Sequence, residues 1–213
     1  MESTYKSAAE LSLKNSTISA NDINVNTLSD ISSAKNDYVD YSASGGGFVA
    51  GQKLSVKNTL DQTSKINLEN SKLLSEQDLN ISAKTTSKYK QRIDNKSSGF
   101  VSLPTSESRL VSNNTQEINL DNNSKIKSQG TTTINLDTSN ALESRVSSIA
   151  KNFAGAPEAY SYITTTINNT INNRGQIGAG NLVDINFMNS SVNNLTVYAN
   201  TQNDAAVAKT YQN

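Results

Sequence analysis

The sequence contains no histidine, no cysteine and no tryptophan among its 213 residues. The usual serine and cysteine triads need an imidazole to accept the proton of the nucleophile, so hydrolases of those classes are excluded. Zinc sites built from histidine and cysteine are excluded as well. These absences predict a chain without catalytic or metal-binding residues of the common kinds.

Charge is also scarce. Charged residues make up 18% of the chain, below the roughly 25% of an average protein. The 19 basic and 19 acidic residues cancel, and the lysines are scattered rather than gathered in a stripe that could neutralise phosphates or anionic lipid. We therefore expect neither nucleic acid nor a membrane surface as a partner.

Long apolar runs are missing too. No segment approaches the roughly 18 apolar residues of a membrane-spanning helix, and no apolar stretch of signal-peptide length opens the chain. Asparagine, serine and threonine supply most of the polarity. Large aliphatic residues are nearly as scarce as in disordered chains, but the zero net charge and only two prolines argue for a folded protein.

A repeat of about 52 residues is the strongest signal in the sequence. Four stretches share an apolar–polar–apolar triplet, a variable residue, asparagine with serine, and then another apolar residue. Repetition at a fixed period is typical of a solenoid, because stacked coils place equivalent residues in the same environment. The four stretches are Leu11–Ile18, Ile66–Leu73, Ile118–Ile126 and Ile185–Val192.

A second recurring motif, which begins with glycine, supports the same repeat period. The Gly-Phe-Val-Ala of Gly47–Ala50 recurs as the Gly-Phe-Val-Ser of Gly99–Ser102, 52 positions further on. The last interval between the four stretches is longer, at 67 positions, which predicts an insertion within residues 154–181. We therefore expect a single solenoid over residues 1–213, with units at about 11–65, 66–117, 118–184 and a partial unit at 185–213.

Within each unit apolar and polar residues alternate, which is the period of a β-strand. Each triplet points two apolar side chains inward and one polar side chain outward. Asparagine, aspartate, serine and glycine separate the triplets and predict a tight corner after every short strand. The residues predicted to face inward are Leu13, Ile23, Leu68, Ile81, Leu120, Ile134, Ile185 and Val197. Those predicted to face solvent are Asn24, Asn67, Asn80, Asn119, Asn135 and Asn186.

These features predict an all-β fold, a parallel β-helix (β-solenoid) of short strands. Coils of roughly 20 residues would give some ten coils and, at about 4.8 Å per stacked strand, a rod on the order of 50 Å long. The core would be a thin column of isoleucine, leucine and valine, and outward asparagine and threonine would stack in ladders. Residues 140–153 fit two secondary structures, because Asn140–Glu143 resembles a helix capping box whereas the equivalent residues of earlier units favour a strand.

Candidate sites for chemistry are weak. The glycine run at residues 44–51 is not followed by the Gly-Lys-Ser/Thr of a phosphate loop, and more often marks a place where the backbone turns or packs against the next coil. Asp37, Asp40 and Asp61 stand alone, without the spacing of a calcium loop. The arginines also stand alone in the sequence, unlike the clustered acids and bases of polysaccharide lyases. The four arginines are Arg92, Arg109, Arg145 and Arg174.

Tyrosines could stack on sugars, and the chain has eight of them, including Tyr38, Tyr41 and Tyr198. Tyr160 and Tyr162 are the best local candidates because they fall in the expected insertion, where a shaft could carry a binding loop. Tyrosines at solvent-facing strand positions are commoner. We therefore assign no catalytic, cofactor-binding or metal-binding residue, and we expect no cofactor and no enzymatic activity.

The chain nevertheless resembles a known family. Residues 11–20 (Leu-Ser-Leu-Lys-Asn-Ser-Thr-Ile-Ser-Ala), 22–27 (Asp-Ile-Asn-Val-Asn-Thr) and 44–51 (Ser-Gly-Gly-Gly-Phe-Val-Ala-Gly) resemble the repeat region of filamentous-haemagglutinin-like adhesins, especially the very large leukotoxin-type filamentous adhesins of anaerobic bacteria. The resemblance spans nearly the whole chain. It implies a right-handed parallel β-helix, export across two membranes and display on or release from the cell surface. It carries over no functional residue.

The expected function is a non-catalytic shaft segment of a large secreted or cell-surface bacterial adhesin, of which this chain would be a fragment. The expected partners are neighbouring coils of the same larger chain or copies stacked end to end, together with glycans or proteins of host or bacterial surfaces. Nucleic acid and membrane insertion are not expected. Two alternatives stay open, a phage tail-fibre β-helix and a polysaccharide-active β-helix enzyme.

Overall fold

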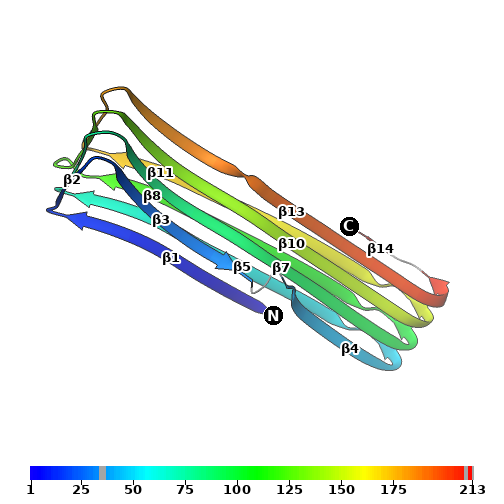
Figure 1. Cartoon of the computed structure of the whole chain (residues 1–213). Coiled ribbons are helices and arrows are strands. Elements are labelled where there is room, and N and C mark those ends of the chain that lie inside the picture. The colour runs from blue at the N-terminus through cyan, green and yellow to red at the C-terminus, as the bar shows by residue number, and fades with distance from the viewer. Residues whose placement is uncertain (34–36, 209–210, 213) are drawn as a thin grey trace.

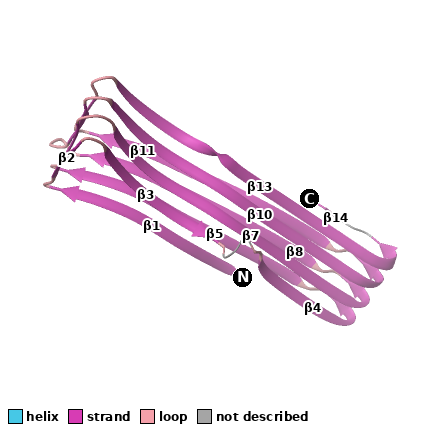
Figure 2. Ribbon diagram, viewed as in Figure 1, coloured by secondary structure: helices cyan, strands magenta, loops and turns pink. Residues whose placement is uncertain are grey.

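The computed structural model describes residues 1–33, 37–208 and 211–212, and describes no side chains within 189–193 or 205–213. The chain forms a parallel β-solenoid of three sheets (Figures 1 and 2). The predicted all-β parallel solenoid is therefore confirmed. No helix in the described part of the chain is long and apolar enough to cross a bilayer.

Each sheet collects strands from successive coils. The first sheet contains β1 (Glu2–Lys14), β5 (Lys53–Glu69), β8 (Thr105–Leu120), β11 (Glu158–Asn173) and β14 (Tyr211–Gln212), in that order. The second contains β3 (Ile23–Ser32), β7 (Leu79–Ser102), β10 (Thr131–Gly155) and β13 (Leu182–Ala208), with β4 (Val39–Ala50) also paired to β7. The short third sheet contains β2 (Thr17–Ala20), β6 (Lys72–Ser75), β9 (Lys125–Ser128) and β12 (Gln176–Gly178).

One sequence repeat makes one complete coil. Leu11 pairs with Ile66, and Ile66 pairs with Ile118, so the equivalent residues of the first three units lie side by side. The four coils are β1–β4, β5–β7, β8–β10 and β11–β13. The prediction of coils of roughly 20 residues, and therefore of ten coils, is wrong.

The coils are long because their strands are long. β7 has 24 residues and β10 has 25, since polar residues that resemble corners in the sequence remain extended and point into the solenoid. At about 4.8 Å per coil the stack is roughly 20 Å high, whereas a 25-residue strand spans about 80 Å. The described chain is therefore a broad plate rather than a rod, with its long strands running across the stacking direction (Figure 1).

The expected insertion within residues 154–181 is absent from the strand ladder. β11 pairs with β8 without interruption from Glu158 to Asn173, and this register places Ile171 beside Ile118. Ile185 instead pairs with Ile134 in the second sheet. The stretch at Ile185–Val192 is therefore not equivalent to the other three, because Ile171 occupies the position equivalent to Ile118, and a unit boundary at 185 is wrong.

The interior is apolar at one end and polar across much of its width. A cluster that includes Ile66, Leu73 and Ile134 fills the space where the three sheets meet. Further along, buried polar side chains between the two long sheets alternate with two smaller apolar clusters, one around Leu60 and one around Val56. Gln62 donates to the Thr86 carbonyl over 2.6 Å and accepts from the hydroxyl of Ser87 over 2.6 Å. Isoleucine, leucine and valine do form the apolar clusters, as predicted, but the buried polar side chains between the sheets were not predicted.

The predicted alternation of inward and outward residues along the strands agrees with the burial of most of these side chains. Five of the residues predicted to face inward are buried, and Leu13 packs, partly buried, against the apolar cluster. Ile185 and Val197 are 45% and 49% exposed, because β13 is an edge strand with a partner only on the β10 side. Asn24 is exposed, and the other five predicted outward asparagines are partly exposed. The five buried residues are Ile23, Leu68, Ile81, Leu120 and Ile134.

The ambiguous residues 140–153 are extended. They form part of β10 and pair with β7 and β13 on its two sides. Leu142 and Val146 are buried, and so are Asn140, Ser144 and Ser148 between and beyond them. The strand alternative is therefore the correct one, and the inward positions of this part of β10 carry both apolar and polar residues.

Candidate functional site

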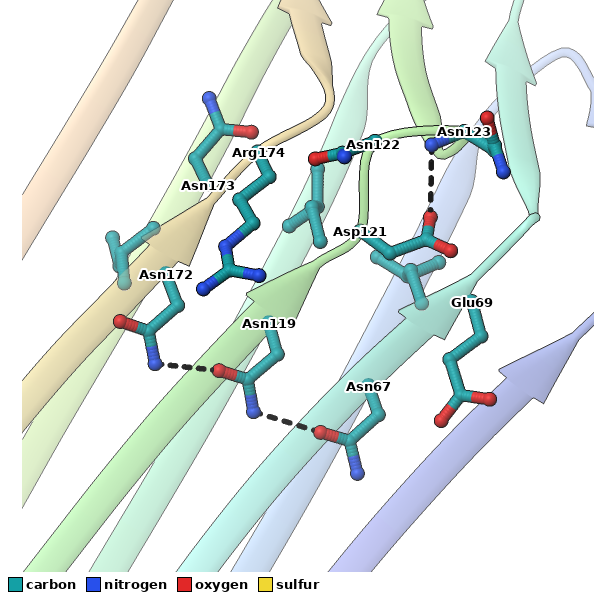
Figure 3. A pocket seen from close by; sticks show the side chains of 12 residues that line it. Asn67, Glu69, Asn119, Asp121, Asn122, Asn123, Asn172, Asn173 and Arg174 are labelled. Carbon is teal, nitrogen blue, oxygen red and sulfur yellow. Dashed lines mark hydrogen bonds between the residues drawn. The ribbon is translucent and has the colours of Figure 1, made fainter.

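A ladder of asparagines crosses the outer surface of the first sheet. Asn67, Asn119 and Asn172 occupy equivalent positions in β5, β8 and β11. The Nδ2 of Asn172 donates to Oδ1 of Asn119 over 2.8 Å, and the Nδ2 of Asn119 donates to Oδ1 of Asn67 over 2.8 Å (Figure 3). The expected stacking of outward asparagines is thus confirmed at these positions.

A polar groove lies beside this ladder, where β5, β8 and β11 end. It has a volume of about 780 Å³. The turn after β8 forms one wall, and Arg174 extends along the groove from the end of β11 (Figure 3). The groove is lined by Asn67, Leu68, Glu69, Asn119, Leu120, Asp121, Asn122, Asn123, Ile171, Asn172, Asn173 and Arg174.

The acidic groups of the groove have structural partners. Asp121 accepts hydrogen bonds from the hydroxyl of Ser124 and from the backbone N–H groups of Asn70 and Asn123, at 2.6, 3.0 and 3.2 Å. These bonds, that of Ser124 above all, hold the pKa of Asp121 below its ordinary value. Glu69 pairs with Lys14 at 2.9 Å. The groove therefore offers amide donors and acceptors, while its carboxylates hold turns and coils together.

A second cluster gathers aromatic and charged groups on the outer face of the second sheet. Tyr38 lies over β7 and β10, with the guanidinium groups of Arg92 and Arg145 at 4.9 and 5.3 Å from its ring centroid. The hydroxyl of Tyr38 donates to Glu143, which also accepts from Nε of Arg145 over 2.5 Å. Arg92 binds both carboxylate oxygens of Asp40, at 2.8 and 3.1 Å. Cation–π contacts and ion pairs thus tie three coils together.

The electrostatics of this cluster follow from its contacts. Partial burial alone would raise the pKa of Glu143, but the hydrogen bonds from Tyr38 and Arg145 and the charges of Arg145 and Lys90 outweigh it, so that the pKa lies below its ordinary value. Glu143 is therefore ionised at neutral pH. The charges in the cluster neutralise one another, which suits a cross-coil brace better than an acid–base pair.

The expectation that the arginines stand alone is wrong for two of them. Arg92 and Arg145 are direct neighbours in the ladder of β7 and β10. They are 53 positions apart, close to the repeat period, and that spacing is the signal that could have found them. Arg109 contacts the ring of Tyr162 at 5.4 Å, and Arg174 lies at the asparagine groove.

The other sequence candidates lie in regular structure. Residues 44–47 of the glycine run are in β4, and a Cβ on Gly99 would lie 2.0 Å from the carbonyl oxygen of Gly47. The close approach of backbones between coils is therefore confirmed. Asp61 accepts from Asn113 over 2.8 Å, and Asp37 is exposed. Tyr160 and Tyr162 lie in β11, paired with β8, so the binding loop expected around them is not formed.

Among the residues that the structure describes, no group of three or more acidic side chains is placed to hold a metal ion. Neither protein-family models, nor curated proteins, nor solved structures match this chain. The features that bear on function are therefore the solenoid, its surface ladders and its edges.

Proposed function

We propose that this chain is a non-catalytic structural segment of the shaft of a large secreted or cell-surface bacterial adhesin. The observation that carries the proposal is the in-register stacking of coils over most of their width, with one register shift between β10 and β13 at Thr138–Asn140. Equivalent residues lie side by side from coil to coil, as with Leu11, Ile66 and Ile118. Such a stack extends by adding coils, and each new coil repeats the same contacts.

The edges of the sheets support extension. β13 pairs only with β10, and β1 pairs only with β5, within the described part of the chain. The free side of β13 leaves Ile185, Phe187 and Val197 about half exposed, although equivalent residues of inner coils are buried. A further coil would bury these side chains and satisfy the free backbone groups. The partner proposed for each edge is therefore another coil, from the same larger chain or from a second copy.

The surface supports a spacer role with ligands recognised elsewhere on the parent protein. Outward ladders such as Asn67, Asn119 and Asn172 keep the plate polar and link its coils. The resemblance of residues 11–27 and 44–51 to filamentous-haemagglutinin-like repeats supports the adhesin class and a location outside the cell. Glycans or proteins of host or bacterial surfaces are the proposed ligands of the whole adhesin.

Sedimentation velocity over a range of concentrations tests the stacking. We expect concentration-dependent association that is lost in the double variant Ile185→Lys/Phe187→Lys, because charges would then occupy the face that the next coil must cover. Leu103→Lys is the matched control, since Leu103 is an exposed apolar residue in the turn between β7 and β8, away from the edge strands. A monomer at every concentration would contradict the stacking of copies, and a discrete trimer would favour a tail-fibre assembly.

Location outside the cell has a separate test. Antibodies raised against this segment should label intact bacteria that produce the parent protein, or bind protein released into the medium. Labelling only after the cells are broken would contradict the adhesin proposal without affecting the stacking result.

A further inference from the structure

Three phenylalanines form an exposed stack at the rim of the plate. The ring centroids of Phe48 and Phe100 are 5.1 Å apart, those of Phe100 and Phe153 are 5.0 Å apart, and the planes differ by only 3° and 8°. The three side chains are 76%, 48% and 54% exposed. They lie close to the turns that join β4 to β5, β7 to β8 and β10 to β11, which are stacked together at the lower right of Figure 1.

The strand register explains the stack but not its exposure. Gly47 pairs with Gly99 and Val49 pairs with Val101, so Phe48 must lie opposite Phe100 at the spacing of adjacent strands. Asparagine ladders elsewhere on the surface link coils while remaining polar. At this rim Val49 and Leu103 are also exposed. The result is an apolar ridge, made of Phe48, Phe100 and Phe153, that stacking alone does not require.

Two lysines flank the ridge on the same outward face. Lys96 precedes Phe100 by four positions and Lys151 precedes Phe153 by two, so each shares the strand face of its phenylalanine. Both lysines are exposed, and neither makes an ion pair with another described residue. The acid at the start of β11, Glu158, is only partly exposed and accepts from the hydroxyl of Thr105 at 3.5 Å. The ridge thus combines protruding rings with unpaired positive charge.

We propose that this ridge is a docking site for the surface of an anionic lipid bilayer. Aromatic and aliphatic side chains enter the boundary between headgroups and acyl chains, while nearby lysines attract anionic headgroups. The three rings stack along the coil direction, so a plate standing on this rim would bring all three to the same depth. The contact is interfacial and needs no membrane-spanning segment.

The same features disfavour a protein partner at this rim. A stable protein interface uses roughly 20–30 residues on each side, and the ridge has three phenylalanines. A second copy bound ridge to ridge would also bring Lys96 and Lys151 toward their own counterparts, and like charges repel. A membrane surface, which the scattered lysines of the sequence argued against, is thus the proposed partner of this rim. It is independent of the proposed shaft function.

The absence of tryptophan from the chain allows a single-site test. The variant Phe100→Trp places one fluorescent reporter in the ridge, and Leu28→Trp places the same reporter on an exposed site away from it. With vesicles of phosphatidylcholine and phosphatidylserine, we expect the emission of the ridge reporter to shift to the blue and to be quenched by lipids brominated in their acyl chains. The reporter at position 28 should not respond.

Vesicle flotation with the otherwise unaltered chain gives the second measurement. The triple variant Phe48→Ser/Phe100→Ser/Phe153→Ser should lower the bound fraction about tenfold or more, and Lys96→Glu/Lys151→Glu should remove the preference for phosphatidylserine. Leu28→Ser is the control, and circular dichroism with thermal unfolding shows whether each variant keeps its fold. If the triple variant unfolds, the fluorescence of the Phe100→Trp reporter alone tests whether the ridge enters the bilayer. An unresponsive ridge reporter, or one that shifts with protein concentration in the absence of lipid, would overturn the proposal.

Discussion

Asn119 donates a hydrogen bond from its side-chain amide to Oδ1 of Asn67 and accepts one from Asn172, each over 2.8 Å. One residue therefore links three coils at once. Because a net hydrogen bond contributes about 0.5–1.5 kcal/mol, we expect Asn119→Ala to lower the free energy of unfolding by about 1–3 kcal/mol. Asn113→Ala, which removes a single bond to Asp61 from the same strand, should cost about half as much. Equal urea midpoints for the two variants would contradict the ladder.

A substitution at Leu68, in the apolar core, should lower the free energy of unfolding more than Asn119→Ala does. This side chain is 1% exposed and belongs to the cluster where the three sheets meet. Leu68→Asp would bury a carboxylate without a partner, and we expect a loss of several kcal/mol in the free energy of unfolding. Leu28→Asp, at an exposed position of β3, should change it little. Denaturant titration compares the two, and similar losses would show that the inward and outward faces are wrongly assigned.

The backbone contact between Gly47 and Gly99 gives a third prediction. Since a Cβ at position 99 would lie 2.0 Å from the Gly47 carbonyl oxygen, Gly99→Ala must push β4 away from β7. We expect a destabilisation of roughly 1–3 kcal/mol, the usual cost of overpacking, with faster hydrogen exchange in β4. Gly178→Ala is the control, because nothing lies within 4 Å of the added carbon there. Unchanged exchange in β4 would argue against the register.

The lowered pKa of Glu143 predicts how the stability of the fold depends on pH. Burial favours its neutral form, but the bonds from Tyr38 and Arg145 prevail, so its pKa in the folded chain lies below the ordinary 4.5. A carboxyl with a lowered pKa stabilises the fold above its unfolded pKa, and that stability is lost as pH falls through the folded pKa. Stability should therefore fall on acidification from about pH 4.5 downward.

Two variants isolate this contribution. Glu143→Gln should lower stability at neutral pH and make the acid limb of the profile shallower. Tyr38→Phe keeps the ring over the arginines but removes the donor, so it should cost about 1 kcal/mol at neutral pH and reduce the acid dependence only in part. The measurement is the thermal midpoint as a function of pH. An acid limb unchanged in Glu143→Gln would exclude this carboxylate as a source of the dependence.

The proposed absence of catalysis can be tested directly. We expect no turnover of polysaccharides or peptides, with or without added calcium, measured as the release of reducing ends or new amines. The polar groove lined by Asn119, Asp121 and Arg174 is the place to mutate if turnover is found. Activity that disappears in Asp121→Asn while the fold persists would replace the shaft proposal with an enzymatic one.

The sequence predicted the faces of the strands better than the length of the coil. Alternation places Ile81 inside and Asn67 outside correctly, because burial on one side of a strand imposes a period of two. Coil length was missed because Ser87, Gln91 and Asn95 resemble loop residues, yet they are buried inside β7. Their hydrogen bonds cross to the opposite sheet, and such partners are distant in sequence.

Two other sequence predictions failed for a similar reason: the position of Ile185 in the repeat and the isolation of Arg92 and Arg145. The Ile-Asn-Phe triplet at Ile185 matches the motif more closely than the Ile-Asn-Asn at Ile171, so pattern matching selected the wrong strand. Arg92 and Arg145 are isolated in the chain, and only the coil period brings them together over Tyr38. Contacts between coils follow from the register, which a local motif does not fix.

The stacking of whole coils also determines how the protein would respond to mechanical force. The hydrogen bonds between parallel strands run close to the stacking direction, although somewhat slanted. Tension along that direction would load the ladders β5–β8, β6–β9 and β7–β10 together, because all three join the same two coils. Force applied at a single turn, such as the one between Ser102 and Thr105, would instead peel one strand and break its bonds in sequence. A filament of such plates would resist pulling along its axis far better than local prying.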